Sequence, residues 1–524
     1  MTGLMAASTT GSTYDVVVVG SGGGALTGAF LAQRAGLATV VVERTTRVGG
    51  TSAYSGGACW LPGSAVQQRA GIADSTESAR DYLGAVLGGD PDWSPDEAKV
   101  ERFLAHSPEV VAALEEAGVP FEWLPFPEYY DAPGRCPMGR SIQPQAITRD
   151  ELPAEVAALV RPPVERDRVG GEGRRTLTGG QALVARLLAG FVEAGGTVLT
   201  GHRVTDLLTD DSSESPAAGR VVGVRAETAD GVVEVGANRG VLLAAGGYEG
   251  DPGARAERGV PGSTAWSMAP RGTNAGEPIA AAASLGAAVD WTGQGWFCPG
   301  LEQPDGGGSF TLGFRSGIML DATGRRYGNE SLAYDRFGRV MAAHPDRIPS
   351  WFVFDSREGG RLPGIAMPEG DPAEHLAAGT WVRAETLSGL AEATGLPHAA
   401  LADSVARWNE SCGTGIDEEF GRGADEYDTF FTYGEGPNKA LTPIDTPPYL
   451  AARFVLSDLG TKGGLVTDTE GQVLREDGSP LPGLYAAGNT AAPLTGPFYP
   501  GPGAPLGTAM VAASLAVRDL VARA

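Results

Sequence analysis

Two short apolar runs near the start of the chain are rich in β-branched residues. They cover residues 14–20 (YDVVVVG) and 38–43 (ATVVVE). Runs without polar alternation are typical of strands buried on both faces of a parallel sheet. The residues between them begin with small side chains and continue with apolar positions at helical spacing. The order strand, helix, strand predicts a βαβ unit.

The turn after the first run carries the spacing G-x-G-x-x-G/A, with Gly20, Gly22 and Ala25 at its three small positions. Gly20 permits a tight turn, Gly22 lets the backbone approach a pyrophosphate, and Ala25 keeps the helix close to the sheet. Glu43 ends the second run, about 20 residues further on, where a carboxylate can hold a ribose hydroxyl. The combination predicts a dinucleotide site with the phosphates at a helix N-terminus.

The segment that follows the second strand favours a flavin dinucleotide. Residues 47–57 (RVGGTSAYSGG) combine a glycine pair with the hydroxyls of Thr51, Ser52 and Ser55. Such a loop offers small donors to more phosphate and to a ring edge. A second G-x-G-x-x-G does not occur in the sequence. We therefore expect one FAD and no separate nicotinamide nucleotide.

The remaining pattern divides the chain into two kinds of segment. Residues 203–247 read as short strands separated by polar turns, and GLYAAGNT at 483–490 repeats a strand followed by glycine. Longer amphipathic stretches at 381–396 and 399–412 are consistent with helices. The most polar short stretch, 209–219, is expected to be an exposed loop.

We therefore expect an α/β fold in which a Rossmann-like FAD-binding domain carries an inserted α+β catalytic domain. The FAD-binding domain is expected at residues 1–292 and 461–524, and the catalytic (substrate) domain at 293–460, with the active site between them.

Composition excludes several function classes. The chain has 524 residues and a net charge of −24, which disfavours nucleic acid and anionic membranes. The histidines show no metal-ligand spacing, so no metal is expected. The nucleophile elbow and the Walker A loop are also absent from the sequence. Four widely spaced cysteines indicate reduced thiols: Cys59, Cys136, Cys298 and Cys412.

The chain shows no signal-peptide pattern, and the small apolar run at 279–289 is too short to span a bilayer. We expect a cytoplasmic protein without an integral membrane segment. Loose association with a membrane remains compatible with the sequence.

Four segments resemble the fumarate reductase/succinate dehydrogenase flavoprotein superfamily: VVVVGSGGGALTGAFLA, VGGTSAYSGG, GVLLAAGG and GLYAAGNT. Within it, the chain is similar over nearly its full length to bacterial 3-ketosteroid Δ1-dehydrogenases. Four further segments carry that likeness: PFPEYYDAPG, NESLAYDRFGR, SDLGTKGGLVTDT and FYPGPGAPLG. Two positions differ from the pattern, Pro502 where glycine is usual and Ala504 where asparagine is common.

The resemblance implies FAD held without a covalent bond, because residues 51–57 lack the histidine of covalent relatives. It implies contacts to FAD from Gly20, Ser21, Gly22, Gly23, Gly24, Ala25, Glu43, Arg44, Gly50, Thr51, Ser52, Ser55, Gly56, Gly57, Val204, Ala245, Gly246, Gly488, Asn489, Pro505 and Leu506.

The resemblance also implies a reaction and its catalytic residues. Introducing a C1–C2 double bond into a 3-ketosteroid such as 4-androstene-3,17-dione removes a proton from C2 and a hydride from C1, and an external electron acceptor reoxidises the flavin. The hydroxyl of Tyr499 and the N–H of Gly503 are expected to polarise the C3 carbonyl. Tyr334 is expected to be the base. Tyr129 is expected to assist it, with the adjacent Tyr130 as the alternative.

Three other functions are compatible with the fold. A 3-ketosteroid Δ4-(5α)-dehydrogenase would act at C4–C5 instead. A fumarate- or urocanate-type reductase would need histidines near a dicarboxylate, and GTKGG at 460–464 has none. A noncatalytic FAD-fold binding protein would need none of the three tyrosines.

Overall fold

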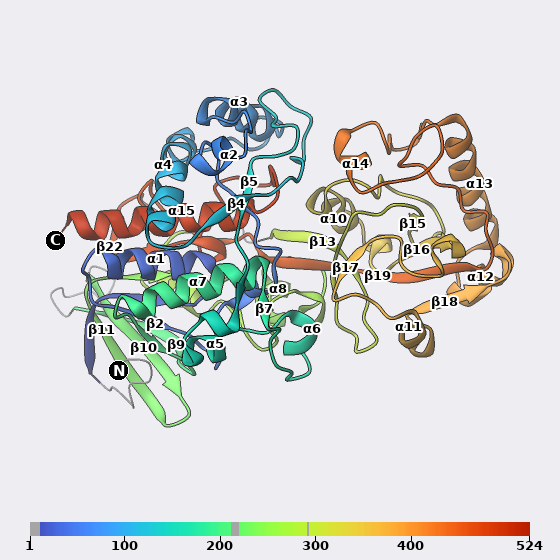
Figure 1. Cartoon of the computed structure of the whole chain (residues 1–524). Helices are drawn as coiled ribbons and strands as arrows, with labels where there is room; N and C mark the ends of the chain where they lie inside the picture. Colours follow the sequence, from blue (N-terminus) through green and yellow to red (C-terminus); the bar gives the residue numbers. More distant parts are fainter. Residues whose placement is uncertain (1–10, 211–218, 291–292, 524) are drawn as a thin grey trace. The chain divides into compact units, whose positions relative to one another are not determined.

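The computed structural model describes residues 11–210, 219–290 and 293–523 (Figure 1). The chain forms two compact units. Unit 1 comprises Met1–Gly259, Ala269–Gln294 and Thr461–Ala524, and unit 2 comprises Val260–Met268 and Gly295–Gly460. The short segment Val260–Met268 thus groups with unit 2, whereas the sequence-based limits placed it in the FAD-binding part. Residues 211–218 of the expected polar loop, and the expected boundary at 292, lie outside the described residues.

Unit 1 is built on a sheet whose central strands run parallel. Its main path runs in the order β21-β22-β11-β1-β2-β8, and β10 joins β11 to β9. The bounds are β1 Ser12–Val19, β2 Thr39–Val42, β8 Thr197–Leu199, β9 Arg203–Thr209, β10 Val221–Thr228, β11 Gly231–Leu243, β21 Gln472–Leu474 and β22 Pro480–Ala486. The predicted βαβ unit is confirmed, since β1 pairs in parallel with β2 and helix α1 (Gly23–Arg34) connects them.

Two glycines let α1 pack closely on its neighbours. A Cβ atom at Gly24 would lie 3.0 Å from the Cβ of Ala509, which belongs to α15 (Ala504–Ala522). At Gly28 it would lie 2.7 Å from Leu242 of β11. Ala25 is 1% exposed, as a position facing a packed sheet requires. These small residues bring α1 against both the C-terminal helix and the sheet (Figure 1).

Smaller elements complete unit 1. The helices are α2 Ala65–Arg69, α3 Thr76–Leu87, α4 Glu97–Glu116, α5 Ala154–Leu159, α6 Val164–Asp167, α7 Gly179–Glu193, α8 Pro252–Glu257 and α9 Glu277–Ser284. The short strands are β3 Cys59–Trp60, β4 Phe121–Trp123, β5 Ser141–Pro144, β6 Ile147–Thr148, β7 Thr176–Leu177, β12 Val289–Asp290 and β20 Gly464–Leu465. Among these, β3, β5 and β4 form an antiparallel sheet in that order.

Unit 2 combines a second sheet with helices. The sheet has the order β13-β19-β16-β15, and β18 pairs with β19. Its strands are β13 Gly295–Leu301, β15 Ile318–Leu320, β16 Ser350–Asp355, β18 Trp381–Ala384 and β19 Tyr449–Thr461, and β14 Phe310–Leu312 pairs with β17 Ile365–Met367. The helices are α10 Tyr334–Ala342, α11 Pro372–Ala378, α12 Leu387–Thr394, α13 His398–Thr414 and α14 Glu426–Phe430.

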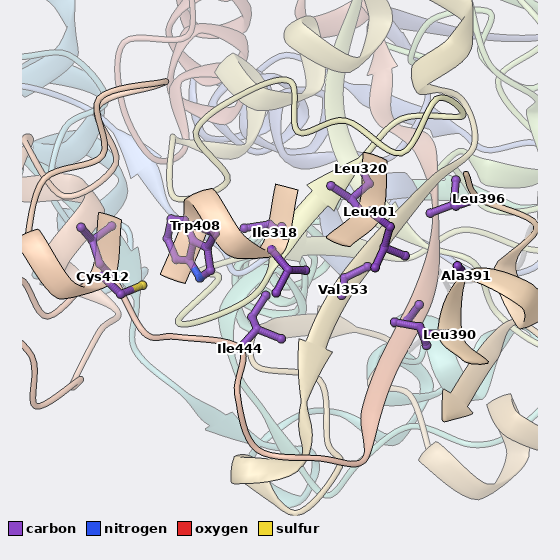
Figure 2. Close-up of a cluster of buried hydrophobic side chains, with 13 residues drawn as sticks. Ile318, Leu320, Val353, Leu390, Ala391, Leu396, Leu401, Trp408, Cys412 and Ile444 are labelled. Atoms are coloured by element: carbon purple, nitrogen blue, oxygen red, sulfur yellow. The ribbon is translucent and has the colours of Figure 1, made fainter. Parts of the chain in front are cut away.

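A buried apolar cluster joins α12 and α13 to this second sheet. Figure 2 shows Leu390, Leu401 and Trp408 from the helices beside Ile318 and Val353 from the strands. Trp408 is 1% exposed. This cluster is the part of the unit 2 core that anchors both helices to the strands.

The expected helix at 399–412 is confirmed by α13, but the one at 381–396 is wrong in its first part. Trp381–Ala384 forms strand β18, paired antiparallel with β19. The helix starts only after Thr386, whose side chain accepts a hydrogen bond from the N–H of Gly389. The spacing of apolar residues in this stretch indicated a helix throughout. Pairing with β19 makes its first part a strand, and the N-cap at Thr386 fixes where the helix begins.

Among the described residues, one helix is long and apolar enough to cross a membrane by length and composition. It is α15, with a mean hydropathy of 1.3, and 61% of that window is buried inside the structure. The core helix of a folded domain has the same properties.

Candidate active site

The carboxyl ends of the parallel strands in unit 1 meet at one edge. Val19 of β1 is in register with both Val42 of β2 and Leu243 of β11, and Leu243 is in register with Ala486 of β22. The glycine turn, Glu43 and the segments that follow β11 and β22 therefore leave the sheet at the same edge. Open parallel sheets bind their ligands at this edge.

The glycine turn fits an incoming pyrophosphate. Gly20 has φ of 99°, and a Cβ atom there would collide with the carbonyl of Ala244. Gly22 caps α1 without a side-chain hydrogen bond, and the first turn of α1 holds no acidic residue. A helix start without acidic side chains suits an anion.

A hydrogen-bond network fixes Glu43 at the end of β2. Its Oε2 accepts a 2.5 Å hydrogen bond from the hydroxyl of Ser21, which in turn accepts one of 2.9 Å from the N–H of Gly49. Its Oε1 accepts from the N–H of Thr45 at 2.8 Å. Arg161 donates to the hydroxyl of Thr45 at 2.7 Å. The carboxylate is therefore held still at the position where a ribose is expected.

The 3-10 helix η1 (Gly50–Tyr54) supplies hydroxyl groups beside the glycine turn. The Oγ of Ser52 accepts from the N–H of Gly23 at 3.0 Å, and the Oγ of Ser55 accepts from the N–H of Gly57 at 3.1 Å. The Oγ1 of Thr51 is buried and has no hydrogen-bond partner among the described residues. A buried hydroxyl without a partner costs free energy, so a ligand oxygen at this place explains it.

Thr490, which was not among the predicted site residues, links two predicted segments. Its hydroxyl accepts from the N–H of Ala245 at 2.9 Å and donates to the carbonyl of Gly246 at 2.8 Å. Thr490 ends η7 (Gly488–Thr490), so this one side chain joins the segment after β11 to the segment after β22. Thr490 lies in the strand-then-glycine segment GLYAAGNT, which is the sequence signal that could have indicated it.

The remaining predicted cofactor residues also lie in unit 1. Arg44 forms a 2.9 Å ion pair with Glu277, and Val204 is buried on β9. A Cβ atom at Gly23 would lie 2.9 Å from Leu506, so the starts of α1 and α15 meet. The others are Gly50, Gly56, Gly488, Asn489 and Pro505.

The first turn of α15 presents free amides. Gly503 caps the helix with φ of 81°, and a Cβ atom there would overlap the carbonyl of Ala58. Within residues 11–210, 219–290 and 293–523, no hydrogen bond uses the N–H of Gly503 or of Leu506 as donor. Pro505 between them has no N–H. Both amides are therefore available to a ligand, as the site prediction for these residues requires.

The carbonyls of Pro500 and Pro502 in the same turn accept hydrogen bonds from unit 1. The carbonyl of Pro500 accepts from the hydroxyl of Tyr82 at 2.6 Å and from the N–H of Tyr129 at 3.1 Å. The carbonyl of Pro502 accepts from Ser141 Oγ at 2.6 Å. These bonds turn the carbonyls toward the protein. The proline that departs from the usual glycine therefore keeps its carbonyl in a defined hydrogen bond.

Neighbouring residues hold the rest of the turn. The carbonyl of Gly503 accepts from the N–H of Trp60 at 3.2 Å, and that of Pro497 accepts from Lys462 Nζ at 3.0 Å. Ala504 is 1% exposed and begins the helix, so its small side chain fills packed space. A terminal segment rich in proline and glycine is thus fixed from several sides.

Tyr129 and Tyr499 lie against each other. Their ring centroids are 5.2 Å apart with an interplanar angle of 81°, and the residues are 1% and 3% exposed. The adjacent Tyr130 packs instead on Phe498, with centroids 6.0 Å apart. The ring contact with Tyr499 thus involves Tyr129.

Tyr334 is the first residue of α10 in unit 2 and is 6% exposed. Its ring meets Phe310 edge to face, with centroids 4.7 Å apart. A Cβ atom at Gly338, one turn further, would lie 2.7 Å from the N of Cys298, so α10 packs closely on β13. The loop before Tyr334 is fixed by Asn329, whose Oδ1 accepts from the N–H of Ser331 at 2.9 Å.

All four cysteines and all five histidines lie in the described part of the chain. Among the described residues, no group of three His, Cys, Asp or Glu side chains could hold a metal ion. All four cysteines are free and buried. Burial raises the pKa of Cys59 and of Cys412 to about 12, which keeps both thiols protonated and inert.

The sheet edge, the glycine cradle and the unpartnered Thr51 define a dinucleotide-binding protein. The family described as "FAD binding domain" matches residues 15–506. A 3-oxosteroid 1-dehydrogenase of Rhodococcus opacus is 40% identical over 97% of this chain and 99% of its own length. The chain belongs to the 3-oxosteroid 1-dehydrogenase family of FAD-binding proteins.

Two solved structures are similar over 98% of the chain. One is a 3-ketosteroid Δ1-dehydrogenase from Sterolibacterium denitrificans in complex with 1,4-androstadiene-3,17-dione, with a TM-score of 0.89, 30% identity and coverage of 100% of that chain. The other is a 3-ketosteroid Δ4-(5α)-dehydrogenase from Rhodococcus jostii RHA1, with a TM-score of 0.67, 24% identity and coverage of 98% of that chain. The second likeness extends to the fold alone.

Proposed function

We propose that this protein is an FAD-dependent 3-oxosteroid 1-dehydrogenase that introduces a C1–C2 double bond into 3-ketosteroids. The observation that carries the proposal is the turn at 499–503. It combines a buried phenol, Tyr499, with the free N–H of Gly503, and the carbonyls of its two prolines accept hydrogen bonds from other residues. Such a turn provides two donors for one oxygen atom, which is what a reaction through an enolate requires.

The substrate carbonyl determines why these donors are needed. The C2 proton of a 3-ketosteroid is acidic only when the C3 oxygen can take up negative charge. In our proposal the hydroxyl of Tyr499 and the N–H of Gly503 donate to that oxygen. Neutral donors suit an apolar steroid better than an ionised side chain, because an unpaired buried charge is costly.

The proton itself needs a base, and we propose Tyr334, a buried residue at the start of α10. A free phenol has a pKa of about 10, so a tyrosine base must have its anion stabilised by a hydrogen-bond donor. We assign that assistance to Tyr129, whose buried ring and position beside Tyr499 support the choice over Tyr130.

FAD, when bound, accepts the hydride that leaves C1. We propose that the Gly20–Ala25 turn and Glu43 hold its dinucleotide part. The hydroxyl of Thr51 and the N–H groups at the start of α15 would hold another part of the FAD molecule. Residues 51–57 offer no histidine for a covalent link, so FAD is proposed to be held noncovalently. Unit 2 is proposed to be the catalytic (substrate) domain, and an external electron acceptor to complete the cycle.

The choice of carbon atoms separates this proposal from the Δ4-(5α)-dehydrogenase. The C4–C5 double bond already exists in 4-androstene-3,17-dione, so an enzyme that forms only this bond has no reaction with it. The holoenzyme is supplied with this steroid, or with 5α-androstane-3,17-dione, and an artificial electron acceptor, and the products are identified by NMR. We expect a C1–C2 double bond from both steroids. Conversion of the 5α-steroid alone, at C4–C5, would overturn the proposal.

A further inference from the structure

A buried ion cluster includes Glu128, the residue that precedes Tyr129 in the chain. The side chains of Arg140, Glu128 and Asp74 are all 0% exposed. Arg140 Nε donates to Glu128 Oε1 at 2.7 Å and Nη2 to Oε2 at 3.2 Å. Nη1 lies 3.0 Å from Asp74 Oδ1. The chemistry proposed above uses none of these three groups.

Glu128 ties the loop that carries Tyr129 to its surroundings. Besides Arg140, its Oε1 accepts from the indole N–H of Trp60 at 2.9 Å. Its Oε2 accepts from the N–H of Cys136 at 2.8 Å. One carboxylate therefore fixes both ends of the loop and strand β3, which itself binds Gly503 through the N–H of Trp60.

The network continues from Arg140 to the turn of Tyr499. The guanidinium carbon of Arg140 lies 5.6 Å from the ring of Trp60 and 5.5 Å from the ring of Tyr82. The hydroxyl of Tyr82 donates to the carbonyl of Pro500 at 2.6 Å and accepts from the N–H of Tyr130 at 3.2 Å. Tyr82 thus joins the two segments that carry the paired tyrosines.

Stability alone does not account for such a cluster. Burying charges costs desolvation free energy, and well-packed apolar residues of the same volume are often as stable or more stable. Apolar contacts, however, do not fix the relative orientation of the segments that they join. A bidentate guanidinium–carboxylate pair fixes two segments in angle as well as in distance.

We propose that Glu128, through Arg140, Trp60 and Tyr82, is a positioning residue that holds Tyr129 and the turn of Tyr499 in register for polarisation of the substrate carbonyl. The inference rests on the proposed function for the role of Tyr499. An error of about 1 Å in such an alignment can cost roughly 100-fold in rate.

A double-mutant cycle measures the effect through Tyr499. Glu128→Gln keeps the volume and removes the charge, and we expect kcat to fall about 10- to 100-fold with FAD content unchanged. In the Tyr499→Phe background the same substitution should lower kcat by a clearly smaller factor, because one of the groups that it aligns is gone. An equal loss in both backgrounds would show a general structural role and overturn the inference.

Two further variants keep the test decisive. Glu101→Gln breaks an exposed ion pair with Arg80 and serves as the control, with kcat unchanged in both backgrounds. If Glu128→Gln fails to fold, Tyr82→Phe carries the same test, since it removes one hydroxyl and leaves the ion cluster intact. Tyr82→Phe should lower kcat, and by a clearly smaller factor in the Tyr499→Phe background.

Hydrogen exchange separates this inference from the proposed function, because it needs no substrate. In Glu128→Gln we expect faster amide exchange at residues 127–136 and 499–504, with exchange in α1 unchanged. If the wild type converts no 3-ketosteroid but these segments still loosen together, the proposed function fails and the structural coupling stands. Unchanged exchange in the 499–504 segment would overturn the coupling itself.

Discussion

The ring of Tyr129 meets the ring of Tyr499 edge to face, with centroids 5.2 Å apart and an angle of 81° between their planes. The N–H of Tyr129 also binds the carbonyl of Pro500. Edge-to-face pairs contribute about 0.5–1.5 kcal/mol beyond their buried area. The roles of the two hydroxyls are therefore best tested with phenylalanine, which keeps both rings in contact.

Replacing Tyr499 with Phe is expected to lower kcat about 100- to 1,000-fold, the loss typical of one oxyanion donor. FAD content and thermal stability should stay close to wild type because the ring remains. Steady-state kinetics measure kcat, the flavin absorbance measures FAD content, and thermal unfolding measures stability. Tyr485→Phe is the control, since it removes another buried phenol, one bonded to Asp519. If the two variants lose activity alike, the role of Tyr499 is wrong.

Replacing Tyr334 with Phe is expected to lower kcat about 100- to 10,000-fold, the usual contribution of a general base. Binding of FAD and of steroid should persist, as measured by flavin absorbance and by a steroid titration. The matched variant is Tyr327→Phe, a buried tyrosine of the same unit whose hydroxyl lies 2.9 Å from Ser350 Oγ. Near-normal turnover in Tyr334→Phe would remove this residue as the base.

Gly503→Ala is expected to destabilise the protein more than Gly478→Ala. Both glycines have φ close to 80°, so both variants carry the left-handed strain of about 1–2 kcal/mol. A Cβ atom at Gly478 meets nothing within 4 Å, whereas at Gly503 it overlaps Ala58. Overpacking of this kind adds about 1–3 kcal/mol. Thermal unfolding with bound FAD compares the two, and equal losses would contradict the described turn.

Denaturing the yellow protein with acid is expected to release all of its FAD into the supernatant, because residues 51–57 contain no histidine for a covalent bond. Adding FAD back to refolded apoprotein should raise the unfolding temperature, since a ligand at 100 times its Kd stabilises by about 2.7 kcal/mol. The flavin absorbance of the precipitate and of the supernatant shows whether acid releases all of the FAD. Flavin retained in the washed precipitate would contradict noncovalent binding.

The sequence was sufficient for the local parts of the fold and insufficient for the long-range ones. The apolar runs and small residues around Gly20 indicated the strands, the turn and the helix, because those features depend on neighbouring residues. Strand β18 was missed since its pairing with β19 is a long-range contact that helical spacing cannot reveal. The same reason applies to the hydrogen bonds by which the hydroxyl of Thr490 joins two distant segments, accepting from the N–H of Ala245 and donating to the carbonyl of Gly246.

In the candidate site, too, the sequence indicated the local features but not the long-range contacts. The motif with Tyr499 and Gly503 was visible as a rigid turn, but its contact with Tyr129 depends on how the chain folds back on itself. Glu128 lies next to Tyr129 in the motif PFPEYYDAPG, yet no local sequence pattern indicated its ion pair with Arg140. Tyr82 and Ser141 carried no local signal at all, because each acts on a carbonyl far along the chain.

The central claim is most directly tested by a single anaerobic turnover. The yellow holoenzyme is mixed with one equivalent of 4-androstene-3,17-dione, and flavin absorbance and product mass are followed together. The account predicts loss of the flavin absorbance and a product that lacks two hydrogen atoms, with the new double bond at C1–C2. Absorbance that stays unchanged with this steroid and with every other 3-ketosteroid tried would contradict it.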